Sequence, residues 1–237
     1  MDPLHQIFVN AQIEVEGLEA LGKHVRVPRI YEVGDSFIKM EQIRAGRHDE
    51  QISDSLLAKD LISLHKVTND YFGWHNDNFI GDTVQRNDWN VSWCEFFMEM
   101  RLGVQFSLPG CRSLVPLWNE VRKRIREELK CVDEPPSLTH GDLWAGNVLV
   151  DATTNSPVFI DPAVSFSHRE TDLAMMKLFG GFSERVFEEY NALWPLQPGW
   201  QRRNSIYQLY HVLNHVNLFG SSYTSQATRI LKLFEKT

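Results

Sequence analysis

Acidic and amide side chains gather in one short stretch of the sequence, between residues 139 and 161. Asp142 lies within Thr139-His140-Gly141-Asp142-Leu143-Trp144-Ala145-Gly146-Asn147, and Asn147 follows it by five residues. Asp161 comes 14 residues after Asn147, directly behind the apolar run Val158-Phe159-Ile160. Carboxylate and amide oxygens bind hard cations such as Mg2+, and a positioned carboxylate accepts protons. Phosphoryl transfer requires these groups, because it needs an in-line nucleophile and neutralisation of charge by a metal ion.

The order of these residues matches the catalytic loop of protein kinases. That loop reads H-R-D-L-x-x-x-N; its Asp accepts the substrate proton and its Asn holds magnesium. Here His140 and Asp142 are followed by Asn147 in the same register. A hairpin whose ends carry Asn147 and Asp161 places both oxygens within reach of one cation. We therefore predict a kinase-like site with His140 and Asp142 in the catalytic loop and magnesium on Asn147 and Asp161.

Two other interpretations of this stretch explain less. Taken singly, Asp142 and Asn147 are loop residues of the kind that form Asx turns, but this does not account for their joint register. A two-metal phosphoesterase is the rival enzyme, since Gly-Asp and Gly-Asn pairs resemble parts of such sites. Against it, Val148 stands where a His would follow Asn147, and no upstream Asp-x-His completes a pair of metals.

Polar residues outside this stretch have more than one interpretation. Asp172 either caps the helix that begins beside it or braces the catalytic loop with its carboxylate. His211 and His215 have the i, i+4 spacing of a zinc site, but no Glu lies between them as in HExxH. With Asn214 they are predicted to form a polar helix face directed into a pocket or the core. His65, at the end of an apolar helix, is predicted to be a hydrogen-bonded core histidine.

A mostly helical chain must position these residues. Apolar side chains recur at helical spacing in three sets: Leu57, Leu61 and Leu64; Trp93, Phe97, Met100 and Val104; and Trp118, Val121, Ile125 and Leu129. Helices are also predicted at 5–22, 170–180, 184–193, 199–218 and 224–235, and strands at 29–33, 36–40, 147–150 and 158–160. Gly34-Asp35 predicts a hairpin between the first two strands.

The predicted fold class is therefore α+β. A reduced N-terminal lobe, residues 1–42, contains one helix and two strands that lead into a hinge. A helical C-terminal lobe, residues 43–237, carries the catalytic loop and a single metal-binding hairpin.

Composition excludes several classes of partner. Of the 237 residues, 43% are hydrophobic and 23% are charged, with a formal net charge of -7. A negative protein is poorly suited to a sequence-independent grip on nucleic acid. The three cysteines form no CxxC pair and are odd in number, which favours a reducing compartment over a disulfide framework. With no signal-peptide pattern and no apolar run long enough for a bilayer, the sequence predicts a cytoplasmic protein without membrane partners.

The chain resembles the fructosamine (ketosamine) kinases, which share the fold of aminoglycoside and choline kinases. The resemblance covers most of the chain, in the blocks Leu64-His65, 72–81, 140–147, Asp161-Pro162-Ala163, 169–175, 178–182 and 207–215. Trp144 after HGDL, and the FGGF and LYH-LNH blocks, separate this family from its antibiotic- and choline-modifying relatives. The resemblance implies a protein-kinase-like fold and ATP- and magnesium-dependent phosphorylation of a sugar hydroxyl on a ketosamine. The acceptor would be a small-molecule or protein-bound adduct, whose phosphorylated form falls off and so repairs the glycated amine.

The resemblance also implies roles for single residues. The base and metal-ligand roles of the catalytic loop and hairpin carry over unchanged. Trp144 would offer an aromatic face to the sugar, or pack under the loop. The strand at 37–43 matches the hinge of the family, so adenine would pair with backbone groups near Met40, Glu41 and Ile43.

The N-terminal segment, which would bind the nucleotide, departs from the pattern of the family. Glu14 matches a helical Glu that pairs with a strand Lys following a glycine-rich hairpin. Only 13 residues precede Glu14, without glycine or lysine, and Lys23 and Lys39 come after it. The ATP lid is therefore missing from the sequence as written.

Three hypotheses follow. The chain is an active ketosamine kinase with a weakened nucleotide grip, a pseudokinase or binding protein that keeps the pocket, or a fragment of a longer kinase. An aminoglycoside- or choline-type kinase fits less well. We expect weak or undetectable kinase activity for the chain as written, because each lost charge-assisted contact is worth roughly 1.5–3 kcal/mol. The sugar, the amine carrier and the oligomeric state stay open.

Overall fold

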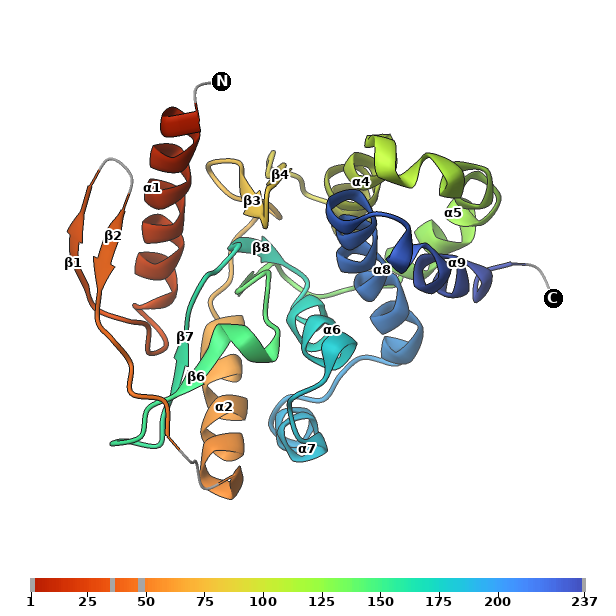
Figure 1. The fold of residues 1–237 in the computed structure, drawn as a ribbon. Coiled ribbons are helices and arrows are strands. Elements are labelled where there is room, and N and C mark those ends of the chain that lie inside the picture. Colours follow the sequence, from red (N-terminus) through yellow and green to blue (C-terminus); the bar gives the residue numbers. More distant parts are fainter. Residues whose placement is uncertain (1–2, 35–36, 47–49, 236–237) are drawn as a thin grey trace.

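The structure is a computed structural model that describes residues 3–34, 37–46 and 50–235. Its elements (Figure 1) are, in order, α1 (Pro3–Leu21), β1 (Ile30–Val33), β2 (Ile38–Met40), α2 (Glu50–His65), β3 (Asn78–Ile80), β4 (Thr83–Gln85), α3 (Trp93–Phe96), the π-helix η1 (Phe97–Gly103), α4 (Val104–Ser107), η2 (Pro109–Leu114), α5 (Val115–Lys130), β5 (Ser137–Thr139), η3 (Ala145–Asn147), β6 (Val148–Val150), β7 (Pro157–Phe159), β8 (Ser165–Ser167), α6 (Glu170–Phe179), α7 (Glu184–Leu193), α8 (Trp200–Phe219), η4 (Ser221–Tyr223) and α9 (Thr224–Lys232).

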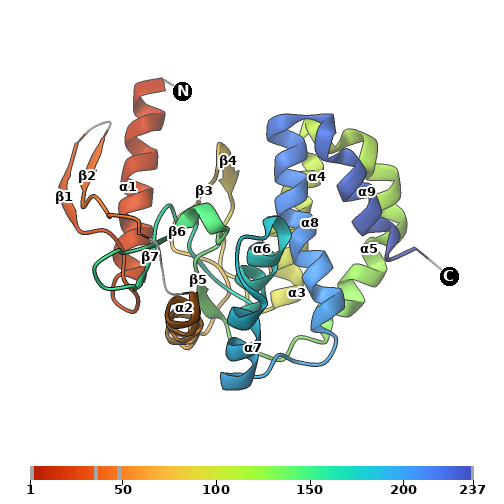
Figure 2. The same ribbon diagram turned by 60° about the horizontal axis from the view of Figure 1, so that its bottom comes forward.

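The N-terminal part consists of α1 beside the hairpin β1–β2, and Figures 1 and 2 show the two side by side at one edge of the molecule. β1 and β2 pair antiparallel, with Val33 opposite Ile38. The Gly34 N–H donates to the Phe37 carbonyl at 2.9 Å. The two predicted strands are confirmed; Asp35 of the predicted turn lies outside the described residues.

Among the described residues after β2, three more strand pairs are antiparallel: β3–β4, β5–β8 and β6–β7. The prediction of a single hairpin in this part was therefore wrong. The β3–β4 pair turns at Gly81, whose φ is +57°, so Gly81-Asp82 was a turn signal that the sequence contained. β5 and β8 are distant in sequence, and no local turn signal marks such a pair.

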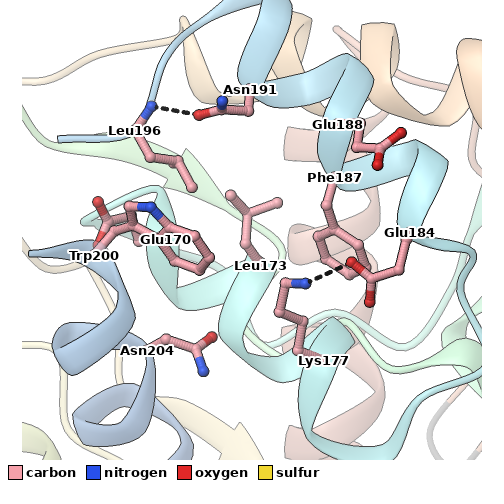
Figure 3. A pocket seen from close by; sticks show the side chains of 10 residues that line it. All are labelled: Glu170, Leu173, Lys177, Glu184, Phe187, Glu188, Asn191, Leu196, Trp200 and Asn204. Atoms are coloured by element: carbon pink, nitrogen blue, oxygen red, sulfur yellow. Dashed lines mark hydrogen bonds and ion pairs between the residues drawn. The ribbon is translucent and has the colours of Figure 1, made fainter. Parts of the chain in front are cut away.

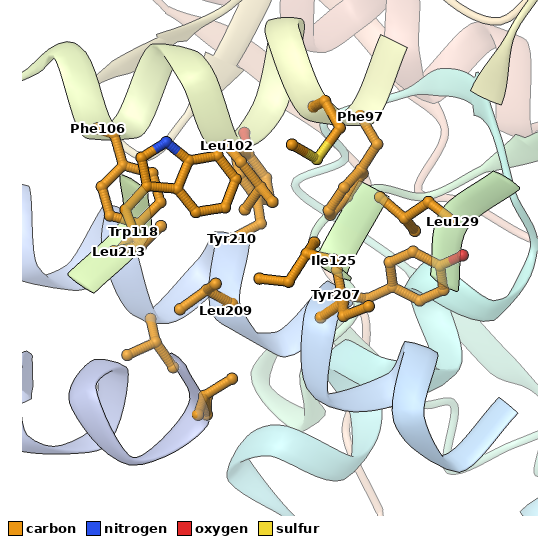
Figure 4. Close-up of a cluster of buried hydrophobic side chains, with 14 of the residues drawn as sticks. Phe97, Leu102, Phe106, Trp118, Ile125, Leu129, Tyr207, Leu209, Tyr210 and Leu213 are labelled. Carbon is orange, nitrogen blue, oxygen red and sulfur yellow. The ribbon is translucent and has the colours of Figure 1, made fainter. Parts of the chain in front are cut away.

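Helices around α8 enclose the larger of two hydrophobic clusters (Figure 4). The predicted face of α5 is confirmed, since Trp118, Val121, Ile125 and Leu129 are all buried. Trp118 stacks on Phe106 with ring centroids 4.5 Å apart. Close packing of this kind makes each buried side chain costly to truncate.

The segment from Trp93 to Ser107 departs from the predicted regular helix. A π-helical turn, Phe97–Gly103, interrupts it. A π-turn contains more residues than an α-turn, so it rotates the following residues relative to the core. As a result Leu102 and Phe106 are buried, whereas Met100 and Val104 of the predicted stripe are only partly buried.

The second cluster joins α1, α2, α6 and α7 to strands β5 and β7. Leu57, Leu61 and Leu64 of α2 are buried there, as predicted. Leu143 of the catalytic loop belongs to this cluster, whereas Ala163 belongs to the cluster around α8. The loop and its hairpin thus lie where the two clusters meet. The division of the chain at residue 42 stays a prediction.

Candidate active site

Asp172, in the first turn of α6, holds the backbone of the catalytic loop. Its Oδ2 accepts the His140 N–H at 2.8 Å and its Oδ1 accepts the Gly141 N–H at 2.9 Å. Arg169, not Asp172, occupies the N-cap position of α6. Of the two interpretations of Asp172, the geometry therefore matches the one in which it braces the loop.

His65 supports Asp172 from behind. His65 Nε2 lies 3.1 Å from Asp172 Oδ2, and His65 Nδ1 lies 2.8 Å from the Tyr190 hydroxyl. Burial alone would raise the pKa of Asp172, but His65 and the Gly141 N–H more than offset it, so the pKa is lowered. Asp172 is therefore ionised at neutral pH. As predicted, His65 is a fully buried, hydrogen-bonded core histidine.

His140 links the loop to the end of the hairpin. Its Nδ1 accepts the Asp142 N–H at 3.2 Å, which leaves Nε2–H to donate to the Ile160 carbonyl at 3.0 Å. Burial lowers the pKa of His140, in keeping with this neutral ring. Both ring nitrogens are used within the protein, so the structure places His140 as a positioning residue.

Gly141 is required by its backbone and its surroundings. Its φ is +83°, a region that side-chain-bearing residues seldom adopt. A Cβ atom here would overlap the carbonyl oxygen of Ala163. The Ala163 N–H in turn donates to the His140 carbonyl at 2.8 Å, so loop and hairpin are joined at close approach.

The hairpin β6–β7 brings Asn147 and Asp161 together. Val148 pairs with Phe159, and the Ile160 N–H donates to the Asn147 carbonyl at 3.1 Å. The Asn147 amide nitrogen lies 2.9 Å from the Asp142 carbonyl oxygen and 3.4 Å from that of Asp161. Asp161 itself has a φ of +53°. A residue without glycine's freedom stays in this region only where its surroundings hold it there, and such strain concentrates at functional sites.

Asp142 lies where ionisation is disfavoured. Burial raises its pKa first, and the charges of Asp161 and Asp172 raise it further, against a hydrogen bond from Asn147 that lowers it; the result is a pKa of about 7. The Asn147 amide lies 3.3 Å from Asp142 Oδ2. A carboxylate with a pKa near neutrality is suited to accept a proton from a hydroxyl.

Glu14 reaches the same site from α1. Burial raises its pKa, and the nearby charge of Asp161 raises it further. Glu16 fixes α1 in place: its carboxylate lies 2.6 Å from Trp74 Nε1 and 3.0 Å from Asn76 Nδ2. At Gly17 a Cβ would lie 3.0 Å from Pro162 Cγ, so the helix packs directly on the hairpin.

The hinge segment is tied to the hairpin by Arg26. Its guanidinium lies 3.0 Å from Glu41 Oε1 and 2.9 Å from Asp151 Oδ2, beyond the end of β6. The Glu41 N–H donates to the Arg29 carbonyl at 2.8 Å, and its carboxylate accepts the Arg29 N–H at 3.1 Å. Met40 ends β2 just before this contact, and Ile43 follows it.

The donor set suits magnesium. Asn147 and Asp161 offer oxygen ligands, and Asp161 crowds Asp142 and Glu14 with like charge that a cation would relieve. Across the part of the chain that the structure describes, no group of three or more His, Cys, Asp or Glu could hold a metal by itself. Magnesium commonly uses one or two protein carboxylates plus substrate phosphates.

A pocket of about 510 Å3 opens beside Asp142. Trp144 and the ends of α6 and α8 line it, together with His211, Asn214 and His215. The Trp144 side chain is 43% exposed, and its ring lies over Gly146, where any Cβ would overlap it. Trp144 therefore does both things predicted of it: it exposes part of its ring to the pocket, and it packs against the catalytic loop. The polar face of α8 is directed into a pocket, as predicted.

Sequence reasoning missed the polar network behind the hairpin. Gln85 Nε2 lies 3.1 Å from the Ala163 carbonyl oxygen, and Asn78 Nδ2 lies 2.8 Å from that of Val164. The buried guanidinium of Arg101 lies 3.2 Å from Ser165 Oγ. These residues support the chain just after Asp161 by long-range contacts, which residue spacing does not reveal.

A second cavity, of about 190 Å3, lies between α6, α7 and the start of α8 (Figure 3). Leu173 and Lys177 line it from α6. The Lys177 ammonium lies 3.2 Å from Glu184 Oε2 and 3.8 Å from the centre of the Phe187 ring. Its cation is thus already engaged, and the cavity shares none of the catalytic-loop residues.

Solved structures share this architecture. A Thermobifida fusca protein assigned as a fructosamine-3-kinase matches with a TM-score of 0.85 at 31% identity, over 93% of this chain and 78% of its own. A choline kinase from Streptococcus pneumoniae matches with a TM-score of 0.64 at 17% identity, over 99% and 85% of the two chains, a likeness of fold. The protein-kinase-like α+β fold is confirmed. Fold and site together define a kinase-like phosphotransferase.

Sequence relatives make the assignment more specific. A model of the fructosamine kinase family matches residues 5–236. An Enterococcus faecium protein assigned as a ketoamine kinase is 41% identical, over 94% of this chain and 82% of its own. The chloroplastic protein-ribulosamine 3-kinase of Arabidopsis thaliana is 37% identical, over 92% and 70%. The chain belongs to the fructosamine kinase family. As a kinase family, it implies ATP as phosphoryl donor, generally with Mg2+.

Among the helices in the described ranges, none is both long enough and apolar enough to cross a membrane.

Proposed function

We propose that this chain transfers the γ-phosphoryl group of ATP to a sugar hydroxyl of a ketosamine. The observation that carries the proposal is the meeting of the Asp142 carboxylate, the Asn147–Asp161 pair and the Trp144 pocket at one place. The names of two relatives, ketoamine kinase and protein-ribulosamine 3-kinase, support this class of acceptor.

In the proposed reaction Asp142 accepts the proton of the sugar hydroxyl. The hydroxyl oxygen forms a bond to the γ-phosphorus, the bond from that phosphorus to the β,γ-bridging oxygen breaks, and ADP leaves. Asn147 and Asp161 would hold magnesium, which neutralises charge on the phosphates. Asp172 and His140 keep the loop in one conformation, so Asp142 needs no rearrangement before the reaction.

Adenine is proposed to contact the hinge between Met40 and Ile43. The Glu41 N–H and carboxylate are already engaged by Arg29 and Arg26. The Glu41 carbonyl and the Ile43 N–H are therefore the proposed partners. Glu14, beside Asp161, would face the phosphates.

A binding role without turnover is the second candidate. The observation in its favour is that burial and the charge of Asp161 raise the pKa of Asp142 to about 7, so this carboxyl group is partly protonated at neutral pH.

The proposed compartment is the cytoplasm. Cys94, Cys111 and Cys131 are free thiols, which supports a reducing environment.

A panel of acceptors tests the function. The protein would be incubated with ATP and magnesium together with a fructosyl-lysine, choline or an aminoglycoside, and phosphorylated products would be detected by mass spectrometry. We expect phosphate on the fructosyl-lysine alone. Transfer to choline or the aminoglycoside instead would overturn the proposed acceptor class. Nucleotide binding without transfer to any acceptor would favour the binding role.

A further inference from the structure

Aromatic rings gather at one border of the active-site pocket. Phe179, Phe219 and Tyr223 surround His215, with ring centroids 5.0, 5.3 and 4.9 Å from that of His215. We call these four residues the aromatic rim. Phe179 is 42% and Phe219 is 63% exposed, although they line a pocket that also contains Asp142. Large rings left open to solvent beside a catalytic group are placed to contact a ligand.

Two helix C-termini meet at the rim. Phe179 is the last residue of α6, and Phe219 is the last residue of α8. Each helix stops at a glycine with positive φ, +70° at Gly180 and +82° at Gly220. The C-terminal end of a helix carries a partial negative charge, because its last carbonyl groups have no partner within the helix. The rim therefore lies in a field that favours a cation.

The charged side chains that line the pocket also favour a cation. Asp142 is the only carboxylate among its described lining residues, and none of these is a lysine or an arginine. Burial lowers the pKa of His211 to about 3, so this ring is neutral at pH 7. A volume of about 510 Å3 lies in the range that encloses ligands larger than one sugar ring.

We infer that the aromatic rim binds the protonated amine half of the ketosamine while its sugar half lies against Trp144 and Asp142. The inference rests on the proposed function. The nitrogen of a ketosamine is a secondary amine that carries a positive charge at neutral pH, and aromatic faces attract such a cation. The rim would thereby orient the acceptor and favour an amine over an uncharged sugar derivative.

Calorimetry with two matched ligands tests the inference. One ligand is a fructosyl-amine; the other is its N-acetyl derivative, which keeps the sugar and loses the positive charge. The variant Phe219→Leu removes one ring, Phe219→Tyr restores an aromatic face, and Trp89→Leu removes an exposed ring outside the pocket. We expect the parent to prefer the charged ligand, and Phe219→Leu to reduce that preference about two- to fivefold. Phe219→Tyr and Trp89→Leu should keep it.

Equal affinity of the parent for both ligands, or an unchanged preference in Phe219→Leu, would overturn the inference. The proposed function would survive that result if fructosyl-lysine is still phosphorylated. If no ketosamine is phosphorylated, either by 1–237 or by a protein that carries the glycine-rich hairpin and lysine strand of a longer relative before Met1, the proposed function itself fails. Ligand binding thus tests the role of the aromatic rim, and phosphate transfer tests the kinase activity.

Discussion

Asp142 must lose its proton to act as a base, yet its surroundings favour the protonated acid. Burial, and then the charge of Asp161, raise its pKa from 3.8 to about 7 in the metal-free protein. Between these pH values the folded state holds a proton that the unfolded state has released. The free energy of unfolding therefore falls as pH rises through this window. Ionised Asp142 destabilises the metal-free protein at neutral and higher pH.

Replacing Asp142 with Asn should consequently stabilise the metal-free protein, more at pH 8 than at pH 4. A tenfold change in an acid constant corresponds to about 1.4 kcal/mol, so the gain at pH 8 is at most about 4 kcal/mol. Thermal unfolding of parent and variant at both pH values measures it. Asp70→Asn, at an exposed position, is the control and should show no such difference. Equal effects of Asp142→Asn on stability at both pH values would show that the raised pKa of Asp142 is not the cause.

Asp161 is the anionic ligand of the proposed magnesium site. Asp161→Ala should remove the enhancement of ADP binding by magnesium, because Asn147 alone offers no charge to the metal. Calorimetry of ADP with and without magnesium measures this, with Asp70→Ala as the control. The assignment fails if magnesium strengthens ADP binding equally in Asp161→Ala and in the parent.

At the scale of elements, α1 depends on one carboxylate for its position. Glu16 accepts hydrogen bonds from Trp74 and Asn76 and pairs with His75 at 2.6 Å. Glu16→Ala should cost about 1–2 kcal/mol of stability, since these partners are partly solvated. Amide hydrogen exchange should quicken in α1 and stay unchanged in α5. Glu19→Ala, exposed on the same helix, is the matched control; unchanged exchange in α1 of the Glu16 variant would show that other contacts hold the helix.

The helices were more predictable than their faces. The stripe of α5 is local and regular, so spacing alone predicted its four buried residues. The stripe that begins at Trp93 failed after Phe97, because a π-helical turn shifted the register toward Leu102 and Phe106. A single inserted residue in a turn leaves no clear mark on the apolar pattern.

At the scale of the whole molecule, the predicted site residues lie close together in the sequence, whereas the missed ones reach the site only through long-range contacts. His140, Asp142 and Asn147 were found because a short loop orders them, and the structure brings them together with Asp161. Gln85, by contrast, donates a hydrogen bond to the carbonyl group of Ala163, which lies 78 positions later in the sequence. Its role arises from tertiary contacts, which residue types and spacing do not encode.

Turnover by the polypeptide 1–237 should be limited by its low affinity for ATP. Without a glycine-rich turn and a lysine before Glu14, several charge-assisted contacts to the phosphates are absent, each worth roughly 1.5–3 kcal/mol. Glu14, already beside Asp161, would repel the triphosphate. Adding the glycine-rich hairpin and lysine strand of a longer relative before Met1 should therefore strengthen ATP binding and speed transfer by orders of magnitude. Fast turnover by 1–237 alone would show that this fold depends less on such a segment.

The most direct test of the central claim is phosphate transfer from ATP to a fructosyl-amine, measured as phosphorylated product with and without Asp142→Asn. The substitution would be made both in 1–237 and in the extended protein, so that a weak nucleotide grip does not hide the result. We predict that Asp142→Asn abolishes transfer while ADP affinity stays nearly unchanged, because Asp142 orients the hydroxyl and does not hold the nucleotide. If the extended Asp142→Asn protein keeps most of the turnover of its parent, Asp142 is not the base of this transfer.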